Sequence, residues 1–344
     1  MNIEKRSARF GAAILIFSIL LRLVGGMVSP QAKAVGILDV ARDYFWDRHP
    51  TGGVSMVSRP TTVPPTTENT IPTAPTMPVV PAVPIVPTGL TFLPTHIQYT
   101  ALQYGYDCGY RADPAALLQR PLNWKLLDDA PTVLIFHSHA TESYTRQEGE
   151  DYISDGDYRT QNTDHNMVAV GALLAQQLRD RGIGVIHDRQ LHDYPSYSMA
   201  YTNARASVER YLQEYPSICL VLDLHRDAAL NPDGSQFATS ATVNGIASAQ
   251  LMLVAGTDWT GGSHPNWEEN LSLAMKLQVL LEQKNPGLTR PNLLRGCVFN
   301  QDLLAGMLIV EVGTAGNSLA EALTAMPPLA DAIAILSAGA NLKC

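Results

Sequence analysis

The chain has 344 residues, 46% of them hydrophobic, and a formal net charge of −8, which suits one large folded domain with appendages. Residues 1–28 hold four basic residues and one acidic residue, so the remainder of the chain carries −11. This acidic balance argues against nucleic acid or an anionic lipid surface as the main partner. The four cysteines show no CxxC spacing, so the sequence signals neither a thiolate zinc site nor a disulfide framework.

The N-terminus is basic and then apolar, which predicts export of the rest of the chain. Three basic residues precede an apolar run over residues 10–28 that Arg22 interrupts. Positive charge before an apolar segment keeps the N-terminus in the cytoplasm and directs the downstream chain across the membrane. We favour an uncleaved single-pass anchor within residues 1–28. A cleaved signal peptide is the alternative, with residues 31–34 as its candidate cleavage site.

A change of composition separates this N-terminus from the rest of the chain. Residues 60–94 are rich in Pro, Thr and Val and contain Glu68 as their only charged residue. Such a segment cannot bury a core and predicts an extended tether. We therefore expect an anchor over residues 1–28, an extracytoplasmic stalk and linker over 29–97, and one folded domain over 98–344.

Predicted strands and helices alternate along that domain. Strands separated by helices predict an α/β fold with a mostly parallel sheet and helices on both faces. In chain order we expect a strand at 132–137, a helix at 166–181, a strand at 184–187, a helix at 197–214, a strand at 218–225, a hairpin pairing 239–243 with 250–255 across Asn244-Gly245, a helix at 266–284, a strand at 307–312, and helices at 318–325 and 329–336 separated by Pro327-Pro328.

Three predicted strands carry residues that bind metals or transfer protons. His137 and His139 close the first strand, and we expect both imidazoles to point the same way because side chains alternate along a strand. His225 ends the second strand, and Glu311 lies in the third. Open α/β sheets place their sites beyond the carboxyl ends of the strands. The three strands therefore predict one rim with the composition of a metal-hydrolase site.

A zinc hydrolase commonly uses three protein ligands drawn from His, Asp and Glu, and it leaves a fourth position for water. We assign His139, Glu142 and His225 as the ligands and Glu311 as the acid/base. A single strand-end histidine is more often a satisfied polar residue than a ligand. The metal interpretation therefore depends on the joint occurrence of these residues.

Several residues admit other roles. His137 is either an alternative ligand or a catalytic donor that stabilises charge on the substrate, and His165 is a weaker alternative ligand. Ser138 or Ser143 would be a nucleophile in a serine hydrolase, but the chain has no Gly-x-Ser-x-Gly elbow. The His–Asp pairs within 187–197 predict hydrogen bonds inside a polar loop rather than a site.

The same residues resemble the stage II sporulation protein P family of cell-wall hydrolases over roughly residues 130–340. The matching segments are FHSHATESY at 136–144, VG at 170–171, GIGVIHD at 182–188, HDYPSY at 192–197, AY at 200–201, DLHRDA at 223–228 and EVG at 311–313.

The resemblance implies an amidase-like fold over 98–344 and a zinc-dependent N-acetylmuramoyl-L-alanine amidase that cleaves peptidoglycan, with an endopeptidase activity on peptide cross-links. It also implies that the protein is anchored in the membrane at the septum and remodels the septal wall during sporulation engulfment. A lytic transglycosylase and a membrane protein of the engulfment machinery are the implied partners. Two rival functions remain: a catalytically degenerate wall-binding module that recruits other hydrolases, and a serine or metal-independent hydrolase.

The resemblance also implies roles for particular residues. Carried onto this chain, the family pattern matches His139 as the first ligand, His225 as a later ligand and Glu311 as the catalytic carboxylate. The broader amidase group places a glutamate at the start of the first helix, where this chain has His165-Asn166. That departure leaves Glu142 as our choice for the middle ligand.

Overall fold

The computed structural model describes residues 101–122, 126, 130–150, 152 and 158–340. The predicted anchor and the Pro/Thr-rich linker lie outside these residues. The strands are β1 (Leu102–Tyr104), β2 (Val133–Phe136), β3 (Val185–His187), β4 (Leu220–Asp227), β5 (Ala241–Val243), β6 (Ile246–Ser248), β7 (Leu251–Ala255), β8 (Asn292–Leu294) and β9 (Met307–Thr314). The helices are α3 (Pro114–Gln119), α4 (Met167–Arg179), η4 (Tyr197–Met199), α5 (Ala200–Glu214), α6 (Trp267–Lys284), η5 (Gln301–Leu303), α7 (Leu319–Thr324) and α8 (Met326–Ala340), of which η4 and η5 are 3₁₀ helices.

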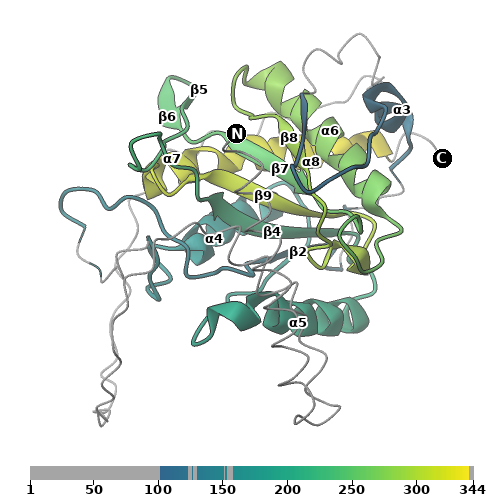
Figure 1. Ribbon diagram of the computed structural model, residues 1–344, viewed down its shortest axis with the longest axis horizontal. Coiled ribbons are helices and arrows are strands. Elements are labelled where there is room, and N and C mark those ends of the chain that lie inside the picture. The colour runs from purple at the N-terminus through teal and green to yellow at the C-terminus, as the bar shows by residue number, and fades with distance from the viewer. Residues whose placement is uncertain (1–100, 123–125, 127–129, 151, 153–157, 341–344) are drawn as a thin grey trace, which may run out of the picture. The chain divides into compact units, whose positions relative to one another are not determined.

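Seven of the strands form one sheet in the order β1-β8-β7-β9-β4-β2-β3 (Figure 1). All neighbouring strands run parallel except β7 and β9, which are antiparallel. The predicted α/β fold with a mostly parallel sheet is therefore confirmed. Because of the antiparallel pair, β2, β3, β4 and β9 end at one edge of the sheet, whereas β1, β7 and β8 end at the opposite edge. The predicted site residues belong to the first of these edges.

The two faces of the sheet bury separate apolar clusters, as the alternation of side chains along a strand requires. On β2, Val133 and Ile135 belong to the cluster that includes residues of α4, α6 and α8. Leu134 and Phe136 belong to the other cluster, which includes residues of α5. Helices therefore cover both faces, with α5 on one side of the sheet and α6 and α8 on the other (Figure 1).

Local signals set the ends of α4, the helix that follows the first motif. The side-chain oxygen of Asn166 accepts a hydrogen bond from the backbone N–H of Val168 and caps the helix. Beyond its other end, Gly182 adopts a φ of 77°, which a glycine reaches at little cost. The helix predicted at 166–181 is therefore confirmed.

One predicted strand pairing is wrong. The segment 239–243 was expected to pair with 250–255, but β5 pairs with β6 across Asn244 and Gly245, both of which have positive φ. The two-residue turn is of the kind that favours Asn-Gly. The segment 250–255 instead supplies β7 to the central sheet, where all five of its residues are buried. A continuous apolar run of this kind suits a core strand better than a half-exposed hairpin arm.

The break between the last two helices also differs from the prediction. Pro327 and Pro328 were expected to separate the helices, but α8 begins at Met326 and holds both prolines in its first turn. A proline there breaks no intrahelical hydrogen bond, because the first N–H groups of a helix have no partner.

Among the described residues, one helical stretch, Leu319–Ala338, is long and apolar enough to cross a membrane by length and composition. Fifty-six per cent of its most apolar window is buried inside the protein. The α8 part of this stretch packs against α4 and α6. Its apolar composition is therefore accounted for by the core of the domain.

Candidate metal centre

A buried cluster of His139, Glu142 and His225 lies at the edge where β2, β4 and β9 end. One ligand atom from each residue lies within 4.8 Å of the other two. Glu142 Oε1 is 3.7 Å from His139 Nδ1, and Glu142 Oε2 is 3.4 Å from His225 Nδ1. Each of the three side chains is only 4% exposed. The structure thus brings together the three residues that the sequence proposed as metal ligands.

A tight turn places two of these residues side by side. β2 ends at Phe136, and the backbone N–H of Glu142 donates a hydrogen bond to the carbonyl of His139. The carbonyl of Glu142 accepts from the N–H of Met167 at the start of α4. The turn after β2 and the first residue of α4 therefore hold Glu142 in place.

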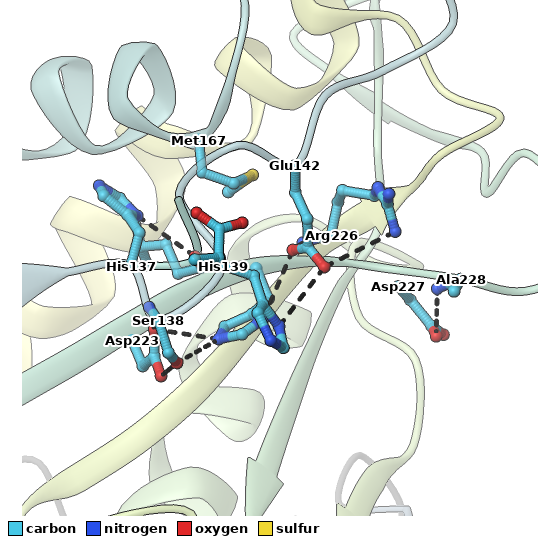
Figure 2. Close-up of polar contacts among 12 residues, drawn as sticks. His137, Ser138, His139, Glu142, Met167, Asp223, Arg226, Asp227 and Ala228 are labelled. Carbon is cyan, nitrogen blue, oxygen red and sulfur yellow. Dashed lines mark hydrogen bonds and ion pairs between the residues drawn. The ribbon is translucent and has the colours of Figure 1, made fainter. Parts of the chain in front are cut away.

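The carboxylate of Glu142 is surrounded by cationic groups (Figure 2). The backbone N–H of Arg226 donates to Oε2 at 3.1 Å, and the Arg226 and Arg159 guanidinium groups lie 3.7 and 3.5 Å from Oε1. Burial alone would raise the pKa of Glu142, but Arg226 and His225 outweigh burial and hold that pKa well below its usual range. Glu142 is therefore a charged carboxylate inside the protein.

The two ring nitrogens of His225 face different partners. Nδ1 faces Glu142, whereas Nε2 lies 3.0 Å from Asp223 Oδ1 and 3.0 Å from Ser138 Oγ. Burial opposes the charged form of the ring, but the carboxylates of Asp223 and Glu142 outweigh it and raise the pKa of His225 well above its usual value. The ring of His225 is thus held by anionic groups at both nitrogens.

The ring of His139 is held by aromatic contacts instead. Tyr197 stacks on it with ring centroids 4.6 Å apart, and Tyr201 packs edge-on at 5.4 Å. Burial lowers the pKa of His139 well below its usual value, so the ring is neutral. Among the described residues, neither of its buried ring nitrogens has a hydrogen-bond partner.

A buried ring nitrogen without a hydrogen-bond partner lowers the stability of the folded protein, and coordination of a metal ion is one way to satisfy it. Two imidazoles and one carboxylate form a donor set that zinc hydrolases use. The residues present at this cluster therefore fit a zinc ion.

Glu311 lies beside this cluster. It pairs in register with His225 on the neighbouring strand, so both side chains project from the same face of the sheet. The residue is 1% exposed, and among the described residues its Oε2 has no hydrogen-bond partner. Burial raises the pKa of Glu311 to about 8. A carboxyl group in this state is able to bind and release a proton near neutral pH.

The structure places His137 apart from the three clustered residues. Its Nδ1 lies 3.2 Å from the carbonyl oxygen of Leu224, and its Nε2 lies 2.9 Å from His187 Nε2. His139, by contrast, lies against two tyrosines of η4 and α5. The expectation that both histidines point the same way is wrong, because β2 ends at Phe136 and strand alternation does not extend through the turn.

The other candidates also lie outside the cluster. His165 stacks on Tyr152, with ring centroids 4.3 Å apart. His192 Nε2 lies 3.0 Å from Asp188 Oδ2, which confirms the expected His–Asp contact in the polar loop. Ser143 is buried, and its hydroxyl has no hydrogen-bond partner among the described residues.

Four residues around the cluster had no assigned role in the sequence analysis: Asp223, Arg226, Arg159 and Tyr197. Asp223 stands two residues before His225 on a predicted strand, so period-two alternation was a signal that could have placed both on one face. Arg226 is adjacent to His225 in the sequence. Arg159 and Tyr197 come from outside the sheet, where no regular pattern predicts which side chains approach the strand ends.

The fold and the site together define an α/β protein with a buried group of two imidazoles and a carboxylate suited to a metal ion. The family model for stage II sporulation protein P (SpoIIP) matches residues 96–334. The chain therefore belongs to the stage II sporulation protein P family.

A curated relative supports this assignment. Stage II sporulation protein P of Bacillus subtilis (strain 168) is 31% identical over 215 residues, which cover 59% of this chain and 50% of that protein. The chain thus spans about half the length of the curated relative it matches.

Three solved structures resemble the chain more distantly. The CwlD amidase from Clostridioides difficile in complex with the GerS lipoprotein has a TM-score of 0.38 and 10% identity, over 61% of this chain and 98% of that chain. The N-acetylmuramyl-L-alanine amidase Ami1 from Mycobacterium abscessus has a TM-score of 0.33 and 14% identity, over 62% of this chain and 99% of that chain. The N-acetylmuramoyl-L-alanine amidase AmiC2 of Nostoc punctiforme has a TM-score of 0.35 and 10% identity, over 62% of this chain and 98% of that chain. At these scores the likeness carries no argument about site or function.

Proposed function

We propose that the chain is a zinc-dependent peptidoglycan hydrolase, an N-acetylmuramoyl-L-alanine amidase that acts in sporulation. The observation that carries this proposal is the buried cluster of His139, Glu142 and His225, with ligand atoms within 4.8 Å of one another. Both ring nitrogens of His139 lack a hydrogen-bond partner among the described residues, as expected for a metal ligand. Membership in the stage II sporulation protein P family supports the cell-wall substrate and the sporulation context.

The residues of the site take separate roles in this proposal. His139, Glu142 and His225 hold the ion. Zinc bound by such a set supplies Lewis-acid activation of a water molecule and of a substrate carbonyl. Glu311 Oε2 accepts a proton from the attacking water and returns it to the nitrogen of the leaving amine. Its position in register with His225 and its burial support this role.

The catalytic role predicted for His137 stays a prediction, and its contacts favour a supporting role. Its ring joins the end of β2 to the carbonyl of Leu224 on β4. Those two chain segments carry His139 and His225, so the contact holds two proposed ligands in a fixed relation.

The proposal includes the cellular setting that the family resemblance implies. The domain would work outside the cytoplasm, tethered by the N-terminal anchor, in septal wall remodelling during engulfment. A lytic transglycosylase and a membrane protein of the engulfment machinery would be its partners. An endopeptidase activity on cross-links would accompany the amidase activity, and mass analysis of digested muropeptides separates the two.

Two substitutions test the assigned roles. Glu311→Gln should retain zinc and lower the rate of cleavage by about 10²-fold or more, because the proton acceptor is removed while the ligands remain. His225→Ala should lose both zinc and cleavage. The measurements are zinc content after dialysis and release of fragments from purified sacculi, with the surface substitution Glu209→Gln as control. Digestion by Glu311→Gln at the parent rate would remove Glu311 from the mechanism.

One observation favours a serine hydrolase as the second candidate. Ser138 Oγ lies 3.0 Å from His225 Nε2, and His225 Nδ1 faces Glu142, which is the order of a catalytic triad. However, Ser138 is fully buried and its hydroxyl donates a hydrogen bond to Asp223, so it lacks the exposure a nucleophile needs.

Metal removal separates these candidates. A chelator should abolish cleavage of sacculi, and zinc added after removal of the chelator should restore it. Activity that survives complete removal of metal would favour the serine mechanism. If the protein binds zinc and sacculi but releases no fragment, the wall-binding module is the correct function.

A further inference from the structure

The ring of His225 has anionic groups on both sides, but the two sides differ in geometry. Asp223 Oδ1 lies 3.0 Å from Nε2, within hydrogen-bond distance. Glu142 Oε2 lies 3.4 Å from Nδ1, and Glu142 is also within reach of His139. Nε2 therefore faces two hydrogen-bond acceptors, Asp223 Oδ1 and Ser138 Oγ, of which only Asp223 is anionic, whereas Nδ1 faces a carboxylate of the proposed zinc site.

Asp223 is itself held in one orientation (Figure 2). The backbone N–H of Ser138 donates to Asp223 Oδ1 at 2.8 Å, and the Ser138 hydroxyl donates to Asp223 Oδ2. Asp223 is 1% exposed and lies two residues before His225 on β4. Both of its oxygens are therefore engaged by the residue that follows His137 at the end of β2.

An imidazole binds a metal ion in its neutral form, which carries one proton, and the partner of one nitrogen decides which nitrogen keeps that proton. A carboxylate at Nε2 stabilises the Nε2–H form, because an ionised acceptor makes a strong hydrogen bond with an N–H donor. The lone pair is then on Nδ1. Partners of this kind orient metal-binding histidines and increase their basicity.

We propose that Asp223, held by Ser138, is a positioning residue that keeps the His225 proton on Nε2 and thereby makes Nδ1 the zinc-binding atom. This inference rests on the proposed function, because it concerns a ligand of the proposed zinc site. Asp223 would act through His225 without touching the ion, and Nδ1 rather than Nε2 of His225 would bind it.

The test measures the zinc dissociation constant of the full chain by competition with a chromophoric chelator. Asp223→Ala should weaken zinc binding by about 10- to 100-fold, the usual cost of losing such a partner. Asp223→Asn should weaken it less, because an amide oxygen still accepts from Nε2–H. Ser138→Ala should also have a smaller effect than Asp223→Ala, because the carboxylate remains.

Asp227→Asn is the matched control. Asp227 lies on the same strand as Asp223, and its Oδ2 lies 2.7 Å from Arg290 Nη1. The substitution Asp227→Asn therefore also removes a carboxylate that forms an ion pair. Its carboxylate makes no hydrogen bond to His225 among the described residues, so zinc affinity should match that of the parent protein.

A second readout needs no substitution at Asp223. In the zinc-loaded parent protein with ¹⁵N-labelled histidine, the His225 signals should show a proton on Nε2 and metal on Nδ1. Metal on Nε2, or parent-like zinc affinity in both Asp223 variants, overturns the inference. A parent protein that binds no zinc at all overturns the proposed function instead, so the two failures are distinguishable.

Discussion

Gly171 stands in the middle of α4 because two histidine rings occupy the space beside it. A Cβ at this position would lie 2.6 Å from His137 Nε2 and 2.6 Å from His187 Nε2. Burial lowers the pKa of both rings, that of His187 to about 4, so the pair is neutral. One neutral ring then donates to the other across the 2.9 Å between their Nε2 atoms.

Gly171→Ala should therefore destabilise the protein, although alanine is the better helix former by about 1 kcal/mol. Overpacking of a buried contact costs about 1–3 kcal/mol, and displacement of His137 also strains its bond to the carbonyl of Leu224. Urea unfolding measures the effect. Ala172→Gly, at the next and half-buried position, is the control and should cost about 1 kcal/mol. A more stable Gly171→Ala protein would mean that the rings move aside freely.

At the scale of elements, a single buried side chain connects the end of β9 to the segment before β5. The side-chain oxygen of Asn317 accepts hydrogen bonds from the backbone N–H groups of Thr314 and Thr239, and its nitrogen donates to the carbonyl of Thr239 at 2.7 Å. Asn317 is fully buried. These bonds satisfy backbone groups of two buried residues, Thr239 and Thr314.

Asn317→Ala should lower the free energy of unfolding by about 3 kcal/mol or more, because buried backbone groups left without a partner cost about 1–3 kcal/mol each. Ser318→Ala is the comparison, since it removes only the cap of α7 and should cost about 1 kcal/mol. Chemical denaturation of both variants measures the difference. Equal losses in the two variants would show that Asn317 contributes no more than an ordinary cap.

At the scale of the whole molecule, the proposed ion would connect distant parts of the chain. His139 and Glu142 follow β2, whereas His225 belongs to β4. A ligand that binds only the folded state stabilises it by about 2.7 kcal/mol when present at one hundred times its dissociation constant. Zinc should therefore raise the Tm of the parent chain.

Thermal unfolding with zinc and with a chelator measures this effect. The His225→Ala protein should show no zinc-dependent shift, because the ion loses one of its three ligands. Identical Tm values for the parent chain under both conditions would contradict a zinc site in the folded domain. An equal shift in His225→Ala would place the zinc elsewhere in the protein.

The elements that the sequence predicted correctly are those with strong local patterns. α4 has a capping residue and an apolar face, and the short apolar run at β2 lies between polar residues. β1, α3 and β8 were not predicted, because each has only three to six residues and a segment of that length shows no clear period. β3 and α7 are equally short, but flanking residues such as Gly184 and the capping residue Ser318 indicated them.

The mostly parallel α/β class, the family, and the candidate site residues His139, Glu142, His225 and Glu311 could all be predicted from the sequence. Patterns along the chain are enough for this, because caps, strand alternation and short motifs depend on neighbouring residues. The packing of distant segments places β7 beside β9 rather than β5, His137 against His187, and Ser138 against Asp223. Those contacts arise when segments far apart in the sequence pack together, and no periodicity within one segment specifies its partner.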